Sequence, residues 1–145
     1  KQREGFAANL INLPGLKFQI SFCYPKTIDR LNIYQASRLA MKRAVNKLAT
    51  RKTIILVDGP RKITGIDLEQ IPIVGGDRKV FAIACASVIA KVTRDKMMTK
   101  YAKKIPNYGF EKHKGYGTKL HVAQLASLGL SSIHRKSFAP VSKIL

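Results

Sequence analysis

The stretch TIILVDG, residues Thr53–Gly59, is a short apolar run that ends in a carboxylate and a turn. A run of this length and composition favours a buried strand of a parallel sheet. A helix is predicted before it, over residues 27–48, and a short strand, IPIV at Ile71–Val74, follows it. A second long helix begins at Val80. Because strands and helices alternate along the chain, the sequence predicts an α/β fold.

The second long helix has the sequence VFAIACASVIAKVTRDKM at Val80–Met97, which is apolar at first and basic at its end. Apolar residues at helical spacing indicate one face that packs inward. We expect that face to contact a sheet through Phe81, Ala84, Cys85, Val88 and Val92.

The remaining segments complete one predicted domain of 145 residues. Thr27 and Asp29 are cap-type residues for the 27–48 helix. Residues 1–13 are typical of a short helix, and Leu16–Tyr24 alternates as a strand does. After Val80–Met97 we expect a basic loop rich in glycine and aromatic residues over 103–121, a short helix over 118–128, and a basic C-terminal segment.

Lysine and arginine number 27 against 8 acidic residues, so the formal net charge is +19. Such an excess favours nucleic acid as a partner, because lysine and arginine neutralise phosphates. A generally basic surface is the alternative. No run of 18 apolar residues and no apolar signal core occurs, which indicates a soluble cytoplasmic protein with no membrane partner.

Two of the acidic residues are placed where a ligand site is common. Asp58 ends the predicted strand Thr53–Gly59, and Asp77 follows two glycines at the entrance of a helix. If both face one crevice, their repulsion calls for a cation, and oxygen ligands select Mg²⁺ or Mn²⁺. The alternative makes Asp58 a turn residue and Asp77 a helix N-cap. The placement alone leaves both interpretations open.

Other polar residues favour structural roles. Asp95 lies within a helix beside Arg94, Lys91 and Thr99, so we expect a charge pair on that helix or an orienting role rather than metal binding. Cys23 and Cys85 have apolar neighbours and are expected to be reduced thiols. The cysteines and histidines lack the paired spacing of a zinc site.

Six blocks of the sequence together resemble ribonuclease HII, in the order in which that family carries them. They are IDRLNIYQASRLAM at Ile28–Met41, LVDG at Leu56–Gly59, GGD at Gly75–Asp77, ACASVIAKVTRDKMM at Ala84–Met98, YGFEKHKGYGTKLH at Tyr108–His121 and HRKSFAPV at His134–Val141.

The resemblance implies a ribonuclease H-like fold with a C-terminal helical and loop extension, and an endoribonuclease that cuts the RNA strand of RNA/DNA hybrids and ribonucleotides embedded in duplex DNA. It implies two Mg²⁺ or Mn²⁺ ions on four carboxylates, of which Asp58 and Asp77 match the third and fourth. The family's first two lie in an Asp-Glu-x-Gly-Arg-Gly block, which these 145 residues do not contain. We therefore expect an N-terminally incomplete fold and an inactive chain. The alternative is a non-catalytic, basic nucleic-acid-binding module.

The resemblance also implies which residues contact the substrate. Ser87, Lys91 and Arg94 would emerge from the Val80 helix toward the phosphate backbone. Tyr116 would pack on the sugar at the junction of ribonucleotide and deoxyribonucleotide, and Lys114 would hold a phosphate. The alternatives are solvated side chains at Lys91 and Arg94 and a loop tyrosine packed on the domain. The intact enzyme is expected to be a monomer that acts in DNA repair.

Overall fold

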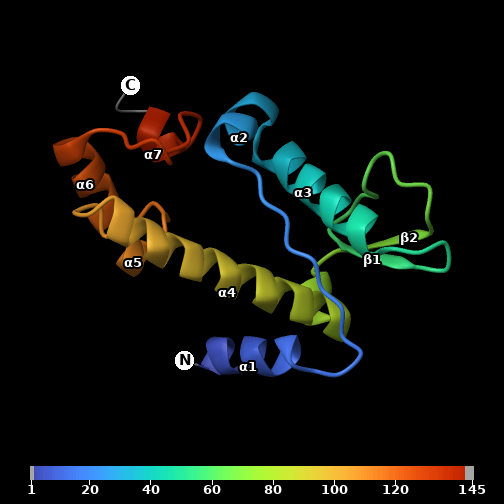
Figure 1. Ribbon diagram of the computed structural model, residues 1–145. Helices are drawn as coiled ribbons and strands as arrows, with labels where there is room; N and C mark the ends of the chain where they lie inside the picture. Colours follow the sequence, from blue (N-terminus) through green and yellow to red (C-terminus); the bar gives the residue numbers. More distant parts are fainter. Residues whose placement is uncertain (1, 143–145) are drawn as a thin grey trace. The chain divides into compact units, whose positions relative to one another are not determined.

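The computed structural model describes residues 2–142 (Figure 1). Helices and a two-stranded parallel sheet make up these residues, which confirms the predicted α/β class. In chain order the elements are α1 (Gln2–Ile11), α2 (Pro25–Leu31), α3 (Ile33–Leu48), β1 (Ile55–Asp58), β2 (Gln70–Ile73), a 3₁₀ turn η1 (Gly76–Arg78), α4 (Phe81–Lys104), α5 (Phe110–His113), α6 (Lys119–Leu128) and α7 (Ala139–Ser142).

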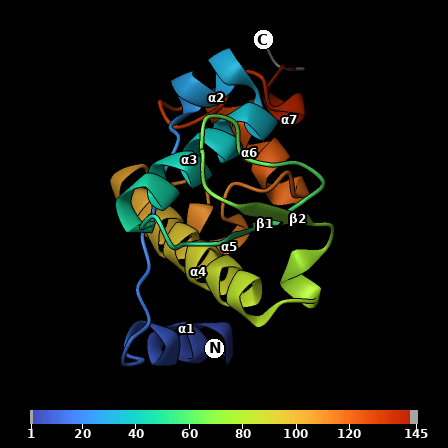
Figure 2. The same cartoon turned by 90° about the vertical axis from the view of Figure 1, so that its right-hand side faces the viewer.

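The contacts divide the chain into two compact units, which are described separately below. The first unit comprises the residues up to Phe22 together with Ser37–Val92, and the second comprises Cys23–Ala36 together with the residues from Thr93 onward. Helix α4 runs without interruption through the boundary between them, as both views show (Figures 1 and 2). The expectation of one ribonuclease H-type domain stays a prediction.

Strands β1 and β2 pair in parallel, with Ile55 opposite Gln70 and Asp58 opposite Ile73. The backbone N–H of Gly59 donates to the Ile73 carbonyl at 2.9 Å, which extends the pairing past β1. Asp58 therefore stands at the carboxyl end of its strand, as predicted.

The sheet packs on one face. Ile55 and Val57 are buried with Ile63, and Val45 of α3 packs against them. Leu56, which points to the opposite face, is 37 % exposed. The prediction of a fully buried strand is therefore wrong for half of its residues, because side chains alternate between the two faces of a strand.

Helix α4 is confirmed, but the residues that it buries differ in part from those expected. It buries Cys85 and Val92 as predicted, together with Ile83 and Ile89, whereas Phe81 is 71 % exposed. The first half of α4 is apolar on several sides, so residue spacing alone could not select its inward face.

The partner of the buried face of α4 also differs from the expectation. Cys85 and Ile89 form a buried cluster with Leu10 of α1, and Leu16 and Ile20 pack against that cluster. The prediction that this helix packs on the sheet is therefore wrong for this cluster.

The predicted strand over Leu16–Tyr24 does not form, since this segment has no regular structure and pairs with neither β1 nor β2. Leu16 and Ile20 pack inward, whereas Phe18 and Phe22 are 39 and 38 % exposed. Alternating side chains are thus insufficient for a strand, which also needs a backbone partner for its hydrogen bonds.

The predicted helix over residues 27–48 is two helices, because Asn32 interrupts it. Asn32 has φ of 67°, and its side-chain Oδ1 accepts from the backbone N–H of Gln35 at 3.0 Å. Asparagine tolerates the left-handed conformation and caps helices, so it ends α2 and starts α3 at one position.

The second unit has its own core, formed by Tyr108, Phe110, Leu125 and Val141. Val141 lies in α7 and is fully buried, so the predicted basic C-terminal segment contributes a helix to this core. The predicted helix over 118–128 is confirmed as α6: Thr118 caps its start, and Gly129 ends it with φ of 72°.

Both cysteines are free thiols, as predicted. Within residues 2–142, no helix is long and apolar enough to cross a membrane.

Candidate active site

Asp58 and Asp77 lie at one corner of the first unit, where the end of β1 meets η1. The Asp58 Oδ1 atom accepts a hydrogen bond from the backbone N–H of Gly76 at 2.9 Å. Gly76 directly precedes Asp77, so this hydrogen bond ties the Asp58 side chain to the backbone next to Asp77. That both carboxylates face one crevice stays a prediction.

The two glycines before Asp77 serve different purposes. Gly75 has φ of 65°, a left-handed conformation that glycine adopts without steric cost. Gly76 is buried, and a Cβ atom placed there would lie 2.6 Å from Ile83 Cδ1 and 3.4 Å from Asp58 Oδ1. Gly75 therefore provides the turn, and Gly76 provides room for the close approach of β1, η1 and α4.

The structure bears on the alternatives left open for these acids. Asp77 is half-buried inside η1 and precedes α4, which begins at Phe81, so it is not the N-cap of that helix. Asp58 contacts the backbone of η1 rather than that of its own turn. Within residues 2–142, neither carboxylate forms an ion pair with a lysine or arginine, although the chain carries 27 of them.

Two carboxylates in this corner suit a hard divalent cation. Mg²⁺ commonly binds through one or two carboxylates and keeps water or substrate oxygens as its other ligands. The described residues include no cluster of three or more acids, histidines or cysteines that could hold a metal. The residues present therefore fit one hydrated Mg²⁺ or Mn²⁺ ion, and a second ion would lack protein ligands.

Helix α4 carries three of the predicted substrate residues. Ser87, Lys91 and Arg94 follow one another at intervals of four and three residues, which places them along one face of a helix. Ser87 is half-buried, whereas Lys91 is exposed. The spacing thus puts one hydroxyl and two cations in a row on α4.

In the second unit, Arg94 lies against Tyr116. The Arg94 Cζ atom is 4.7 Å from the centroid of the Tyr116 ring, which is a cation–π contact. Tyr116 remains 59 % exposed. The Nη1 atom of Arg94 is buried without a hydrogen-bond partner in the described chain, and its contact with Asp95 is an ion pair at 3.9 Å. The guanidinium therefore supports an open aromatic surface and retains hydrogen-bonding capacity.

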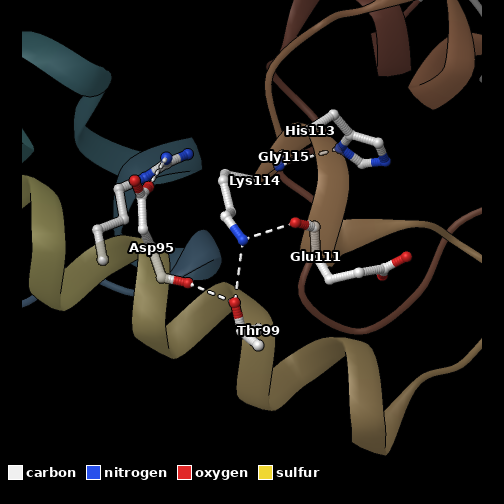
Figure 3. Close-up of polar contacts among 7 residues, drawn as sticks. Asp95, Thr99, Glu111, His113, Lys114 and Gly115 are labelled. Atoms are coloured by element: carbon white, nitrogen blue, oxygen red, sulfur yellow. Dashed lines mark hydrogen bonds and ion pairs between the residues drawn. The ribbon is translucent and has the colours of Figure 1, made fainter. Parts of the chain in front are cut away.

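Lys114 is held by groups of its own unit (Figure 3). Its Nζ atom donates to the Thr99 hydroxyl at 3.0 Å and to the Glu111 carbonyl at 2.6 Å. Thr99 in turn donates to the backbone carbonyl of Asp95 at 3.0 Å. Because an ammonium has three donors, one remains for a phosphate.

The predicted charge pair of Asp95 is formed with Arg94, and its N–O distance of 3.9 Å is long for an ion pair.

Sequence reasoning missed a contact made by Asp29. Its carboxylate accepts from the backbone N–H groups of Lys136 and Ser137 at 3.0 and 2.9 Å, and from the Ser137 hydroxyl at 2.6 Å. The Ser137 hydroxyl bond is the main reason why the pKa of Asp29 is lowered. Asp29 thereby fixes the segment that carries Arg135, whose pKa is lowered by burial and by nearby Arg94. No sequence signal links residues that lie 107 positions apart.

The three histidines were also missed as a group. His113, His121 and His134 come from three segments, yet their rings lie together beside Phe110. Their nitrogens point at carbonyl oxygens, at amide groups and at each other, and not at one common point.

Comparison with known proteins bears directly on this corner and on the loop that carries Tyr116. The family profile described as Ribonuclease HII matches residues 2–141, which include the sheet, η1, α4 and the Tyr116 loop. The chain belongs to the ribonuclease HII family. Its fold is thus the ribonuclease H-like α/β fold expected from the six sequence blocks.

Individual ribonuclease HII proteins agree with the profile. The chain is 48 % identical over its whole length to the Ribonuclease HII of Endomicrobium trichonymphae and covers 69 % of that protein. It is 45 % identical over 97 % of its length to the protein of the same name from Carboxydothermus hydrogenoformans, of which it covers 60 %. For the Bacillus licheniformis protein the values are 54 % identity over 79 % of the chain and 44 % of the relative.

The chain thus spans between 44 and 69 % of the length of these ribonuclease HII proteins. The family consists of hydrolases that act on nucleic acid. The matched region includes both acids of the corner and all of the predicted substrate residues.

Proposed function

We propose that this chain supplies part of the metal site and duplex-binding surface of an endoribonuclease. The enzyme cleaves the RNA strand of RNA/DNA hybrids and cleaves duplex DNA at embedded ribonucleotides. The observation that carries the proposal is the hydrogen bond from Gly76 to Asp58, which ties Asp58 to the backbone next to Asp77 in a ribonuclease HII chain.

In this proposal Asp58 and Asp77 bind Mg²⁺ or Mn²⁺. Together with a second ion held by the carboxylates of the family's N-terminal block, an ion bound there would activate the attacking water and stabilise the leaving 3′-oxygen of the scissile phosphodiester. Water adds to phosphorus and the bond from phosphorus to the 3′-oxygen breaks, which leaves a 5′-phosphate and a 3′-hydroxyl. The two carboxylates would hold one such ion, and Gly76 orients Asp58 through its N–H group.

The duplex would contact the basic face of α4 and the Tyr116 loop. Lys91 and Arg94 would bind backbone phosphates, as would the third donor of Lys114. Tyr116 offers an exposed ring to a sugar or base. The 2′-hydroxyl is the group by which a protein distinguishes RNA from DNA at one site, so we propose that Tyr116 contributes to this choice.

The test measures cleavage, with Mn²⁺ present, of a DNA duplex that carries one ribonucleotide. These 145 residues contain no adjacent Asp-Glu pair, and two carboxylates do not neutralise two divalent ions. We therefore expect the chain to bind the duplex but to cleave it negligibly. The same chain extended by an N-terminal segment carrying Asp-Glu should cleave it.

Asp58→Asn in the extended chain should abolish cleavage, because the amide still accepts from Gly76 but carries no charge. Asp67→Asn is the matched control, since Asp67 is an exposed acid of the same unit. Normal cleavage by the Asp58→Asn protein would overturn the metal assignment.

A second candidate is a basic nucleic-acid-binding module without catalysis. It is favoured by the net charge of +19 and by the lack of a third acid near the corner within residues 2–142. Both candidates predict salt-sensitive binding, so affinity alone does not separate them. An extended chain that binds tightly and never cleaves would favour the module.

The proposal includes a role in DNA repair in the cytoplasm. Cutting at a ribonucleotide within duplex DNA is the first chemical step in replacing it. The named relatives come from bacteria, whose chromosome lies in the cytoplasm.

A further inference from the structure

The second unit contains a partly buried chain of hydrogen bonds that passes through two histidines. The backbone N–H of Ser131 donates to His134 Nδ1 at 2.9 Å, and the Ser131 hydroxyl lies 2.8 Å from the same atom. His134 Nε2 lies 3.0 Å from His121 Nε2, and His121 Nδ1 lies 2.9 Å from the Tyr116 carbonyl oxygen. Ser131 and Tyr116 are thus linked through two imidazole rings.

The donors at the two ends determine where the protons are. His134 Nδ1 accepts from an amide, so the proton of a neutral His134 is on Nε2. The Tyr116 carbonyl can only accept, so His121 carries its proton on Nδ1 and leaves Nε2 as an acceptor. His134 Nε2–H then donates to His121 Nε2. When both rings are neutral, each hydrogen bond from Ser131 through His134 and His121 to Tyr116 thus has one donor and one acceptor.

His113 fixes the adjoining residue of the loop. The Gly115 N–H donates to His113 Nδ1 at 3.1 Å, and His113 Nε2 faces the Tyr108 carbonyl at 2.7 Å. The His113 and His121 rings are stacked, with centroids 4.2 Å apart and planes 12° apart. Two stacked imidazoles therefore hold the N–H of Gly115 and the carbonyl of Tyr116.

We propose that His121 and His134 are positioning residues that fix the backbone of Tyr116 and so orient its ring for the substrate. The inference rests on the proposed function, in which Tyr116 contacts the ribonucleotide. With its carbonyl held by His121 and its ring against Arg94, Tyr116 is constrained at two points while 59 % of it stays exposed. Ordering an exposed aromatic before binding reduces the entropy lost on binding.

The arrangement requires neutral rings. A proton on His121 Nε2 would face the N–H of His134, and a proton on His134 Nδ1 would face the Ser131 amide. Burial is the main cause that lowers the pKa of both rings, and the neighbouring histidines add to it, so that the pKa of His134 falls to about 4. The titratable groups that face the pair are His113, which faces both rings, and Tyr108, whose ring centroid lies 5.2 Å from that of His134. The chain of bonds is therefore intact at neutral pH and breaks in acid.

The first experiment reads the proton positions by ¹⁵N–¹H correlation of the histidine rings in the 145-residue chain at pH 7. We expect His121 protonated at Nδ1, and His113 and His134 protonated at Nε2. Any other tautomer at His121 or His134 would overturn the inference, whatever the chain does to nucleic acid.

The second experiment compares the affinity for an RNA/DNA hybrid with that for a DNA duplex of the same sequence, by fluorescence anisotropy. His121→Leu should reduce the preference for the hybrid roughly five- to tenfold, the effect of one lost hydrogen bond. His121→Asn, whose amide can replace Nδ1–H, should restore much of it. Leu125→Ala is the matched control, because Leu125 is buried in the same unit and makes only apolar contacts.

The outcomes separate the two claims. If Tyr116→Ala leaves the preference for the hybrid unchanged, the proposed contact between Tyr116 and the substrate is wrong. The histidine tautomers then still test whether the chain of hydrogen bonds through His121 and His134 exists. If Tyr116→Ala removes the preference but His121→Leu behaves like Leu125→Ala at equal stability, the histidine is merely structural and the inference is wrong.

Discussion

Gly76 is expected to tolerate no side chain, and Ile83 is expected to be the reason. A Cβ atom at position 76 would approach Ile83 Cδ1 to 2.6 Å, and Ile83 is only 7 % exposed, so it has little room to turn away. We expect Gly76→Ala to lower the free energy of unfolding by about 1–3 kcal/mol, the usual effect of overpacking a core. Ile83→Val removes the clashing atom and by itself should lower that free energy by about 0.5–1.5 kcal/mol.

The unfolding free energy of the double variant, Gly76→Ala with Ile83→Val, tests whether Ile83 causes the clash. With Cδ1 absent, the alanine meets Ile83 only through Cγ2 at 3.5 Å, which is ordinary contact. Urea unfolding of the four proteins should therefore show a favourable coupling of about 1–2 kcal/mol between the two substitutions. Gly75→Ala is the control: its Cβ meets nothing within 4 Å, but φ of 65° makes it strained, so its effect should not depend on Ile83. Additive effects at Gly76 and Ile83, within about 0.5 kcal/mol, would refute this account of the corner.

Three further predictions concern the stability of the second unit. The pKa of His134 is lowered to about 4, so between about pH 6.5 and 4 the unfolded chain binds a proton that the folded chain does not. The free energy of unfolding should therefore fall by about 1–2 kcal/mol as the pH is lowered over that range. His134→Gln should flatten this dependence of the unfolding free energy on pH, as measured by urea titration. Asp29→Asn should weaken the hydrogen bonds that the backbone N–H groups of Lys136 and Ser137 donate, so these amide protons should exchange faster with solvent. Unchanged exchange would contradict the anchoring role of Asp29. Asn32→Ala should lower the free energy of unfolding by about 1–3 kcal/mol, because the side-chain hydrogen bond that caps α3 is lost and alanine is strained at a positive φ. Asn32→Gly should recover part of that loss, because glycine adopts a positive φ without strain.

The local parts of the fold were predictable because their causes are local. The apolar run before Asp58 predicted β1, the apolar helix predicted α4, and Thr118 and Gly129 marked the ends of α6. The end of a strand at Asp58 was also predictable, and Asp58 does stand at the end of β1.

The remaining features depend on contacts between distant parts of the chain. Leu16–Tyr24 has the alternation of a strand, but alternation does not supply a pairing partner. Phe81 has the spacing of a core residue and is 71 % exposed, because the face that a uniformly apolar helix buries depends on its neighbours. Asp29 and the histidine pair act on residues whose proximity only the folded chain creates.

The central claim is that Asp58 and Asp77 together bind a divalent ion. Adding substoichiometric Mn²⁺ to the ¹⁵N-labelled chain should broaden the amide signals next to the bound ion by paramagnetic relaxation, first those of Gly59 and Gly76. Asp58→Asn and Asp77→Asn should each abolish that broadening, whereas Asp67→Asn should leave it intact. Broadening that persists at Gly59 and Gly76 in both site variants, or that never appears there in the unchanged chain, would contradict the claim.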